Sequence, residues 1–190
     1  MAVAIARAAR RGARDGRAAV ATGVVLGVVL GLLFAVAMTG CGHVGAAQSS
    51  VLGTGERNGV RVDVRVDLAD GGGGALRVTF TPLQAGFHLY GMALPDAGID
   101  GVGRPTRVTV AGALTGNGPV SADRPVEQLR VPGVSRPMPV YPDGSITLQL
   151  PVQRKRGNVG DAVVVVGYAA CSADTCLPPV SSLRIPVTLP

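Results

Sequence analysis

Cys171 and Cys176 lie in a short connection between two predicted strands, with four residues between them. The run 162–168 before them is apolar and rich in valine, and 181–189 after them alternates as a half-buried strand does. A hairpin-like connection brings Cα atoms to the roughly 5.5–6 Å that suits a disulfide, so the spacing permits a bond between the two sulfurs. Closing so small a loop stabilises a chain by only about 2–3 kcal/mol, which makes this bond a weak staple for a whole domain.

The chain after position 58 consists of short segments with strand character. In 60–68, apolar residues alternate with arginine and aspartate, the pattern of an antiparallel strand with one solvated face, and the glycines at 71–74 form a hairpin loop after it. Aromatic residues are few, so the core must come from Val, Leu, Ile and Ala. About eight short strands separated by turn signals predict an all-β fold, an immunoglobulin-like antiparallel β-sandwich. The further predicted strands are 76–80, 87–90, 107–110, 126–131, 146–152, 163–168 and 183–189.

Residues 1–41 have the character of a targeting region. Residues 1–17 are rich in arginine, and 18–38 are almost wholly apolar and long enough to cross a bilayer. Cys41 follows small residues, as the acylated cysteine of a lipobox does. The segment is therefore predicted to be a lipoprotein signal with Cys41 lipidated, or an uncleaved N-terminal signal/transmembrane helix. Either way the domain lies on the extracytoplasmic side of the membrane, in the cell envelope (periplasm or outer face).

Composition sets the remaining boundaries and argues against one class of partner. Residues 42–58 are small and polar without periodicity, which predicts a flexible linker before a single domain at 59–190. The net charge of the chain is +6, but from Cys41 onward 13 Lys and Arg stand against 11 Asp and Glu. Basic and aromatic residues do not interleave as single-strand binding requires. Nucleic acid is therefore not an expected partner.

The cysteine segment also carries a family resemblance. Residues 168–179, YAACSADTCLPP, followed by a terminal strand, resemble the signature of the N-terminal domain of DsbD and the related disulfide-corrector (DsbC-like) domains. Residues 86–90 and 140–152 are similar to two further strands of that family, and the resemblance covers about residues 59–189. The aromatic residue that relatives place over the disulfide has no match in 129–139. The resemblance implies a redox-active pair in which Cys176 forms the mixed disulfide and Cys171 resolves it.

Four residues are candidates for the surround of this pair. His88, Tyr90 and Tyr141 pack near it if the strands assemble as in the family. The alternative is that the two tyrosines are core or edge residues and that His88 faces solvent. Asp174, between the cysteines, could relay protons, or it could simply make the turn by hydrogen-bonding its own backbone.

Other site chemistries have little support in the sequence. A hydrolase of the Ser-His-Asp or Cys-His kind would have to rest on His88 alone, since the other histidine lies in the predicted linker. Two cysteines and one distant histidine do not supply the three or four ligands that zinc requires. We therefore expect neither a metal nor a cofactor.

These observations lead to two hypotheses about function. The first is a membrane-tethered thiol–disulfide exchange domain, a component of a thiol–disulfide oxidoreductase resembling protein-disulfide reductases. It would pass reducing equivalents from a membrane thiol electron carrier through the Cys171–Cys176 pair to oxidised envelope proteins, thioredoxin-like or other disulfide proteins. The second is a non-catalytic lipoprotein that binds another protein and whose disulfide is structural, the usual role of paired cysteines outside the cytoplasm.

Overall fold

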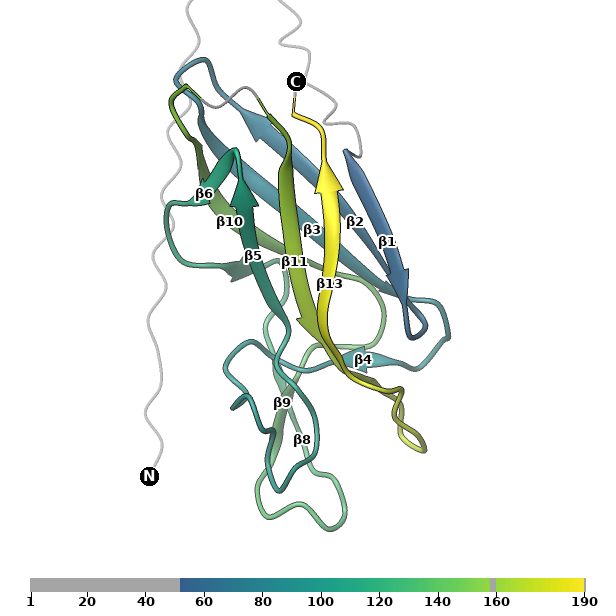
Figure 1. Cartoon of the computed structure of the whole chain (residues 1–190). Coiled ribbons are helices and arrows are strands. Elements are labelled where there is room, and N and C mark those ends of the chain that lie inside the picture. The colour runs from purple at the N-terminus through teal and green to yellow at the C-terminus, as the bar shows by residue number, and fades with distance from the viewer. Residues whose placement is uncertain (1–51, 158–159, 190) are drawn as a thin grey trace, which may run out of the picture. The chain divides into compact units, whose positions relative to one another are not determined.

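The computed structural model describes residues 52–157 and 160–189. Every regular element in these residues is a β-strand, and all the pairings between strands are antiparallel (Figure 1). The predicted all-β fold is therefore confirmed. The described residues contain no helix long and apolar enough to cross a bilayer. The predicted signal or membrane helix, with Cys41, lies outside the described residues.

Two larger sheets form the sandwich and two strand pairs extend it. The larger sheet has the order β1-β2-β3-β10-β6, and β7 also pairs with β10; the smaller sheet has the order β13-β11-β5. The larger sheet comprises β1 (Gly53–Arg57), β2 (Val60–Leu68), β3 (Gly73–Pro82), β10 (Ile146–Arg154), β6 (Leu114–Gly116) and β7 (Ser121–Ala122). The smaller comprises β13 (Val180–Val187), β11 (Ala162–Tyr168) and β5 (Arg107–Gly112). The pairs are β12 (Ala170–Cys171) with β4 (His88–Leu89), and β8 (Glu127–Leu129) with β9 (Met138–Val140).

An aliphatic core fills the space between the two larger sheets. The valines, at every second position of β2, are all buried, while the arginines and aspartates between them are at least partly exposed, as the alternation predicts. Val64 lies opposite Val78, and Val78 lies opposite Leu148, so a row of apolar side chains crosses the larger sheet. Each fully buried side chain of this kind stabilises the fold by about 1.5–3 kcal/mol. The smaller sheet adds buried side chains to the same cluster: Val164, Val166, Ile185 and Val187.

The predicted linker boundary at residue 58 is wrong, because β1 occupies 53–57. Asn58 and Gly59 have φ angles of 48° and 71°, the backbone that a two-residue hairpin loop requires, and Asn-Gly is its preferred sequence. A Cβ added at Gly53 would lie 2.7 Å from the Pro186 carbonyl oxygen, so β1 approaches β13 closely. The small residues that suggested a linker allow this close packing at the edge of the sandwich.

A second, smaller cluster of buried side chains lies apart from the main core. It is formed by Tyr90, Leu94, Ile99, Met138, Val140, Ala169 and Cys171. Met138 and Val140 of this cluster belong to β9, and Leu129 of β8 packs against it. In Figure 1, β8 and β9 lie below the sandwich, at the end opposite the β2–β3 turn. The cysteine hairpin contacts both clusters, because Cys171 belongs to the smaller one, whereas Ala170 belongs to the main core and Leu177 packs against that core.

Candidate functional site

The site is built around a disulfide between Cys171 and Cys176, whose Cα atoms are 4.0 Å apart. Two backbone hydrogen bonds define the hairpin that carries it: Ser172 N–H donates to the Thr175 carbonyl at 2.8 Å, and Leu177 N–H donates to the Ala170 carbonyl at 2.9 Å. The spacing between the cysteines is therefore the spacing of a tight hairpin, as the sequence predicts.

The turn at the tip is stabilised by Ser172, and this corrects the interpretation that Asp174 makes it. The Ser172 hydroxyl accepts hydrogen bonds from the backbone N–H groups of Asp174 and Thr175 at 3.3 and 3.2 Å. Asp174 itself is exposed at the tip. Serine and aspartate make such turns by the same mechanism, so the sequence alone could not choose between them.

The two sulfurs differ in their access to solvent. Cys171 lies in β12, is only 4% exposed, and pairs with His88 of β4. Cys176 follows the turn and is exposed. Thiol–disulfide exchange requires direct attack on sulfur, so a partner protein can reach Cys176 far more easily than Cys171.

Tyr90 contacts the buried sulfur directly. Its hydroxyl donates a hydrogen bond to Cys171 Sγ at 3.1 Å, and its side chain is almost completely buried. Thr106 fixes the backbone of this residue, because its hydroxyl donates to the Tyr90 carbonyl at 2.6 Å. Burial raises the pKa of Tyr90, so the hydroxyl keeps its proton and remains a donor at neutral pH.

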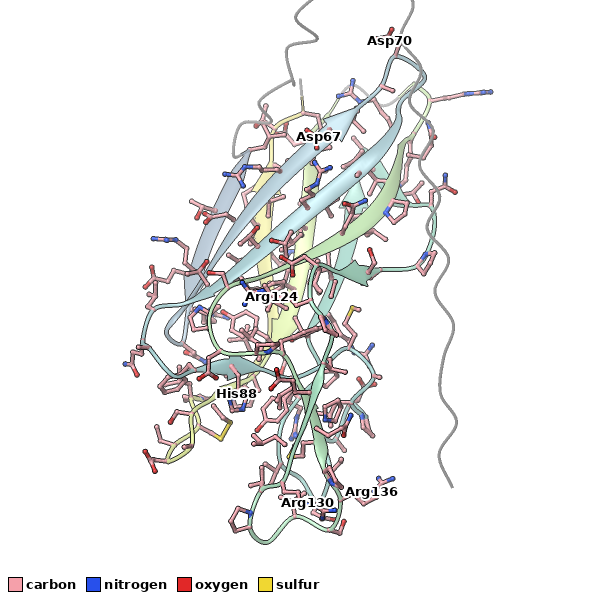
Figure 2. The ribbon with its side chains drawn as sticks, turned by 180° about the vertical axis from the view of Figure 1, so that it is seen from behind. Asp67, Asp70, His88, Arg124, Arg130 and Arg136 are labelled. Atoms are coloured by element: carbon pink, nitrogen blue, oxygen red, sulfur yellow. A yellow bond between two sulfur atoms is a disulfide. The ribbon has the colours of Figure 1, made fainter. Side chains whose placement is uncertain are left out.

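His88 lies beside the disulfide and is buried, so the alternative that it faces solvent is wrong (Figure 2). Its ring packs edge-on against Tyr90, with centroids 5.9 Å apart. Its Nδ1 lies 3.5 Å from Asp143 Oδ1, whereas its Nε2 is buried and has no hydrogen-bond partner within residues 52–157 and 160–189. Burial lowers the pKa of His88, and nearby Asp143 opposes that shift in part, so the imidazole is neutral at pH 7.

Tyr141 does not join the disulfide, in agreement with the interpretation that it is a core residue. It is 1% exposed and belongs to the main cluster between the sheets. Its backbone N–H donates to the Leu89 carbonyl at 2.8 Å, which ties β4 to the segment leading into β10. Tyr141 thus supports the strand that carries His88 without contacting the cysteines.

Three hollows adjoin the hairpin, and none of them could be predicted from the sequence. One, of about 620 Å³, is lined by 85–88, Glu127, Leu129, 140–143 and the turn segment 172–174. A second, of about 360 Å³, lies between His88, Tyr90, the segment 129–132 and the cysteine hairpin. The third, of about 420 Å³, is lined by 101–104, Ala169, both cysteines, Leu177 and Pro179. Their walls come from segments that are distant in sequence, and the periodicity of the sequence does not predict which distant segments lie side by side. The segment 129–132 has no aromatic residue, and the side chains with which it packs against the smaller cluster are Leu129 and Val131.

The described part of the chain holds no group of three or more His, Cys, Asp or Glu side chains placed to bind a metal ion. The polar groups at the site instead surround the disulfide. The Tyr90 hydroxyl donates to the Cys171 sulfur, the His88 imidazole lies on the strand opposite Cys171, and the Cys176 sulfur is exposed. Such an arrangement can support nucleophilic exchange at sulfur, which needs an accessible sulfur and a second thiol close enough to displace the bound partner.

No protein-family model matches the chain, and no curated protein matches its sequence. Among solved structures, the N-terminal periplasmic domain of ScsB from Proteus mirabilis is similar, with 14% identity, a TM-score of 0.50 and coverage of 74% of this chain and 52% of that chain. The N-terminal domain of Neisseria meningitidis DsbD in the reduced form is 17% identical, with a TM-score of 0.41 and coverage of 73% and 86%. The GAE domain of GGA2p from Saccharomyces cerevisiae is 10% identical, with a TM-score of 0.37 and coverage of 74% and 97%.

The chain spans about half the length of the ScsB structure that it matches. The resemblance to DsbD-type N-terminal domains is confirmed as a similarity of structure. At so low an identity this similarity establishes the fold alone. Activity must be argued from the residues of the site.

Proposed function

We propose that this chain is a thiol–disulfide exchange domain of the cell envelope. The observation that carries the proposal is the exposed Cys176 bonded to a buried Cys171 whose sulfur accepts a hydrogen bond from Tyr90. A hydrogen bond to sulfur stabilises a thiolate more than it stabilises a disulfide, because the thiolate is charged. Tyr90 therefore favours the state in which the bond is open.

The exchange reaction follows from the difference in exposure. In the reduced pair, the Cys176 thiolate attacks one sulfur of an oxidised partner, forming a mixed disulfide and releasing the partner's other sulfur as a thiolate. Cys171 then attacks Cys176 Sγ, restoring the Cys171–Cys176 bond and releasing the partner in its reduced form. A membrane thiol carrier returns two electrons to the pair by the reverse steps. The proposed acceptors are thioredoxin-like or other disulfide proteins of the envelope.

The proposed location rests on the N-terminal sequence and on the comparisons. The similar ScsB domain is described as periplasmic. The apolar run at 18–38 and Cys41 support tethering to the membrane, either through lipid on Cys41 or through an uncleaved helix. The segment 42–51, which precedes β1, has linker composition and would connect the tether to the folded domain.

The alternative is that the disulfide is structural and that the domain only binds another protein. The small loop argues against this alternative, because the bond contributes little to folding. The buried hydrogen bond from Tyr90 to one sulfur argues in the same direction. The alternative nevertheless makes a distinct prediction about the reduction potential of the pair.

Equilibration of the full-length chain with glutathione redox buffers measures that potential. A structural disulfide has a potential below about −300 mV, whereas exchange partners have higher potentials. We expect the pair to lie above that value. A potential below it would refute the proposed function.

Trapping experiments test the roles of the two cysteines. In Cys171→Ala the resolving thiol is missing, so Cys176 should accumulate mixed disulfides with envelope proteins on non-reducing gels. Cys176→Ala is the matched control, and it should trap little because Cys171 is buried. Equal trapping by the two variants, or stronger trapping through Cys171, would contradict the assignment.

A further inference from the structure

The buried nitrogen of His88 is a polar group whose environment the fold does not explain. Its Nε2 is enclosed and has no hydrogen-bond partner in the described residues, and such groups are costly to bury. The residue is 7% exposed and lines the hollows on both sides of the turn segment 172–174. A group of this kind requires an explanation, and its position relative to Cys171 supplies one.

The strand pairing places the His88 side chain next to the buried sulfur. Cys171 and His88 are direct partners in the antiparallel pair of β12 and β4, and directly opposite side chains project to the same face with Cβ atoms about 4.5–5.5 Å apart. Tyr90, two residues after His88, projects to that same face and donates to Cys171 Sγ at 3.1 Å. His88, Tyr90 and Cys171 therefore form one compact group.

The resolving step needs a base at this position. Cys171 must lose its proton before it can attack, and its burial disfavours the thiolate and keeps water away. Tyr90 cannot take the proton, because it is itself a protonated donor to that sulfur. A neutral imidazole whose Nδ1–H faces Asp143 has the lone pair of Nε2 free to accept a proton.

We propose that His88 accepts the proton of Cys171 when Cys171 resolves the mixed disulfide, with Asp143 orienting the imidazole and stabilising its charged form. This inference rests on the proposed function. The proton moves from Cys171 Sγ to His88 Nε2, and the thiolate attacks Cys176 Sγ. The Cys171–Cys176 bond forms, the bond between Cys176 and the partner breaks, and its electron pair leaves on the partner sulfur. The imidazolium then releases its proton to solvent past exposed Asp143.

Charged groups from several elements face His88 and set the balance of its protonation. Asp143 is the nearest and favours the charged imidazole. Glu127 of β8 and Asp174 of the hairpin line the same hollow as His88, and Arg130 lines the hollow on the Cys176 side. The last three side chains are exposed, so solvent screens their effect on the imidazole and Asp143 dominates.

The test follows the two steps separately with the disulfide reagent DTNB. The reduced full-length chain carries Cys41→Ser, so that Cys171 and Cys176 are its only thiols. Attack by Cys176 releases a first thionitrobenzoate, and attack by Cys171 on the resulting mixed disulfide releases a second at a rate independent of reagent concentration. His88→Asn keeps an amide N–H toward Asp143 but removes the base. It should slow the second phase at pH 7 by at least about tenfold and leave the first phase unchanged.

The pH profile of the second phase distinguishes a proton acceptor from a purely structural residue. In the parent chain the rate should fall as the pH drops below the pKa of the His88 imidazole. Asp143→Asn should move that midpoint to lower pH, because it removes the carboxylate that stabilises the imidazolium. In His88→Asn the midpoint should disappear, and the rate should rise only as the Cys171 thiol itself ionises. Glu127→Gln is the matched control, an exposed carboxylate in the same hollow, and its profile should match the parent.

An unchanged second phase in His88→Asn, in rate and in pH profile, would overturn the inference. If that variant does not keep the parent circular dichroism spectrum, His88→Gln and Asp143→Asn decide the question in its place. The assay uses a small reagent and no protein partner. A reduction potential below the range of exchange proteins therefore refutes the proposed function, whereas a second phase that does not depend on His88 refutes only the proton transfer.

Discussion

Opening the disulfide should cost little stability and leave the domain folded. The bond joins residues with a sequence separation of 5, so it closes a loop of about six residues and stabilises the chain by about 2 kcal/mol. Cys171 packs in the smaller cluster, and the main core between the sheets contains no cysteine. The reduced domain should therefore keep its β-sheet spectrum and unfold cooperatively at a midpoint about 6–8 °C lower.

Thermal unfolding of the full-length chain, followed by circular dichroism with and without a strong thiol reductant, measures this difference. Cys176→Ser is a second route to the open state, because it removes only the exposed sulfur and needs no reductant. The two routes should agree. Unfolding of the reduced domain at room temperature, or a loss of cooperativity, would show that the disulfide is a structural staple and would refute the reasoning from loop size.

Four further outcomes are expected. Tyr90→Phe should lower the reduction potential by about 20 mV in glutathione buffers, because a hydrogen bond of about 1 kcal/mol to the reduced sulfur is lost; an unchanged potential would count against that bond. Burial lowers the pKa of His88 in the folded state below 6.5, so the unfolded chain binds more protons at acidic pH. The free energy of unfolding measured in urea should therefore reach its full value above about pH 6.5 and decrease as the pH falls below that, and His88→Asn should reduce this pH dependence. Leu148→Ala should cost about 2–5 kcal/mol in urea unfolding, and a near-neutral effect would contradict its place in the core. Cys41→Ser should abolish lipid labelling and leave a precursor that keeps its apolar segment, whereas normal labelling would eliminate the lipoprotein assignment.

The strands that could be predicted are those with one buried and one solvated face. The alternation in β2 and β10 follows directly from that arrangement, and the valine run of β11 from a strand at the centre of its sheet. Strand β1 was missed because Gly53 and Gly55 count against a strand by propensity. These glycines are needed because β13 approaches β1 closely. That contact joins the first and the last strand in the sequence, so the local composition around β1 cannot predict it.

The candidate site could be predicted in part for a similar reason. The cysteine hairpin is local, so the spacing of Cys171 and Cys176 was enough to predict it. The burial of His88 and its position opposite Cys171 depend on the pairing of β4 with β12, across 83 positions of sequence. The hydrogen bond from Tyr90 likewise joins residues 81 positions apart. Family resemblance could bring these residues near the pair, but it could not assign their contacts.

The separation of the two buried clusters has a consequence for how such a domain can change over evolution. Residues that set the stability of the sandwich lie in the main cluster, whereas those that surround the disulfide lie mostly in the smaller one. Substitutions at distant sites that share no contacts have nearly additive effects. The loops at the redox end can therefore diversify to suit new partners while the valine-rich sandwich stays constant, and neither change need compensate for the other.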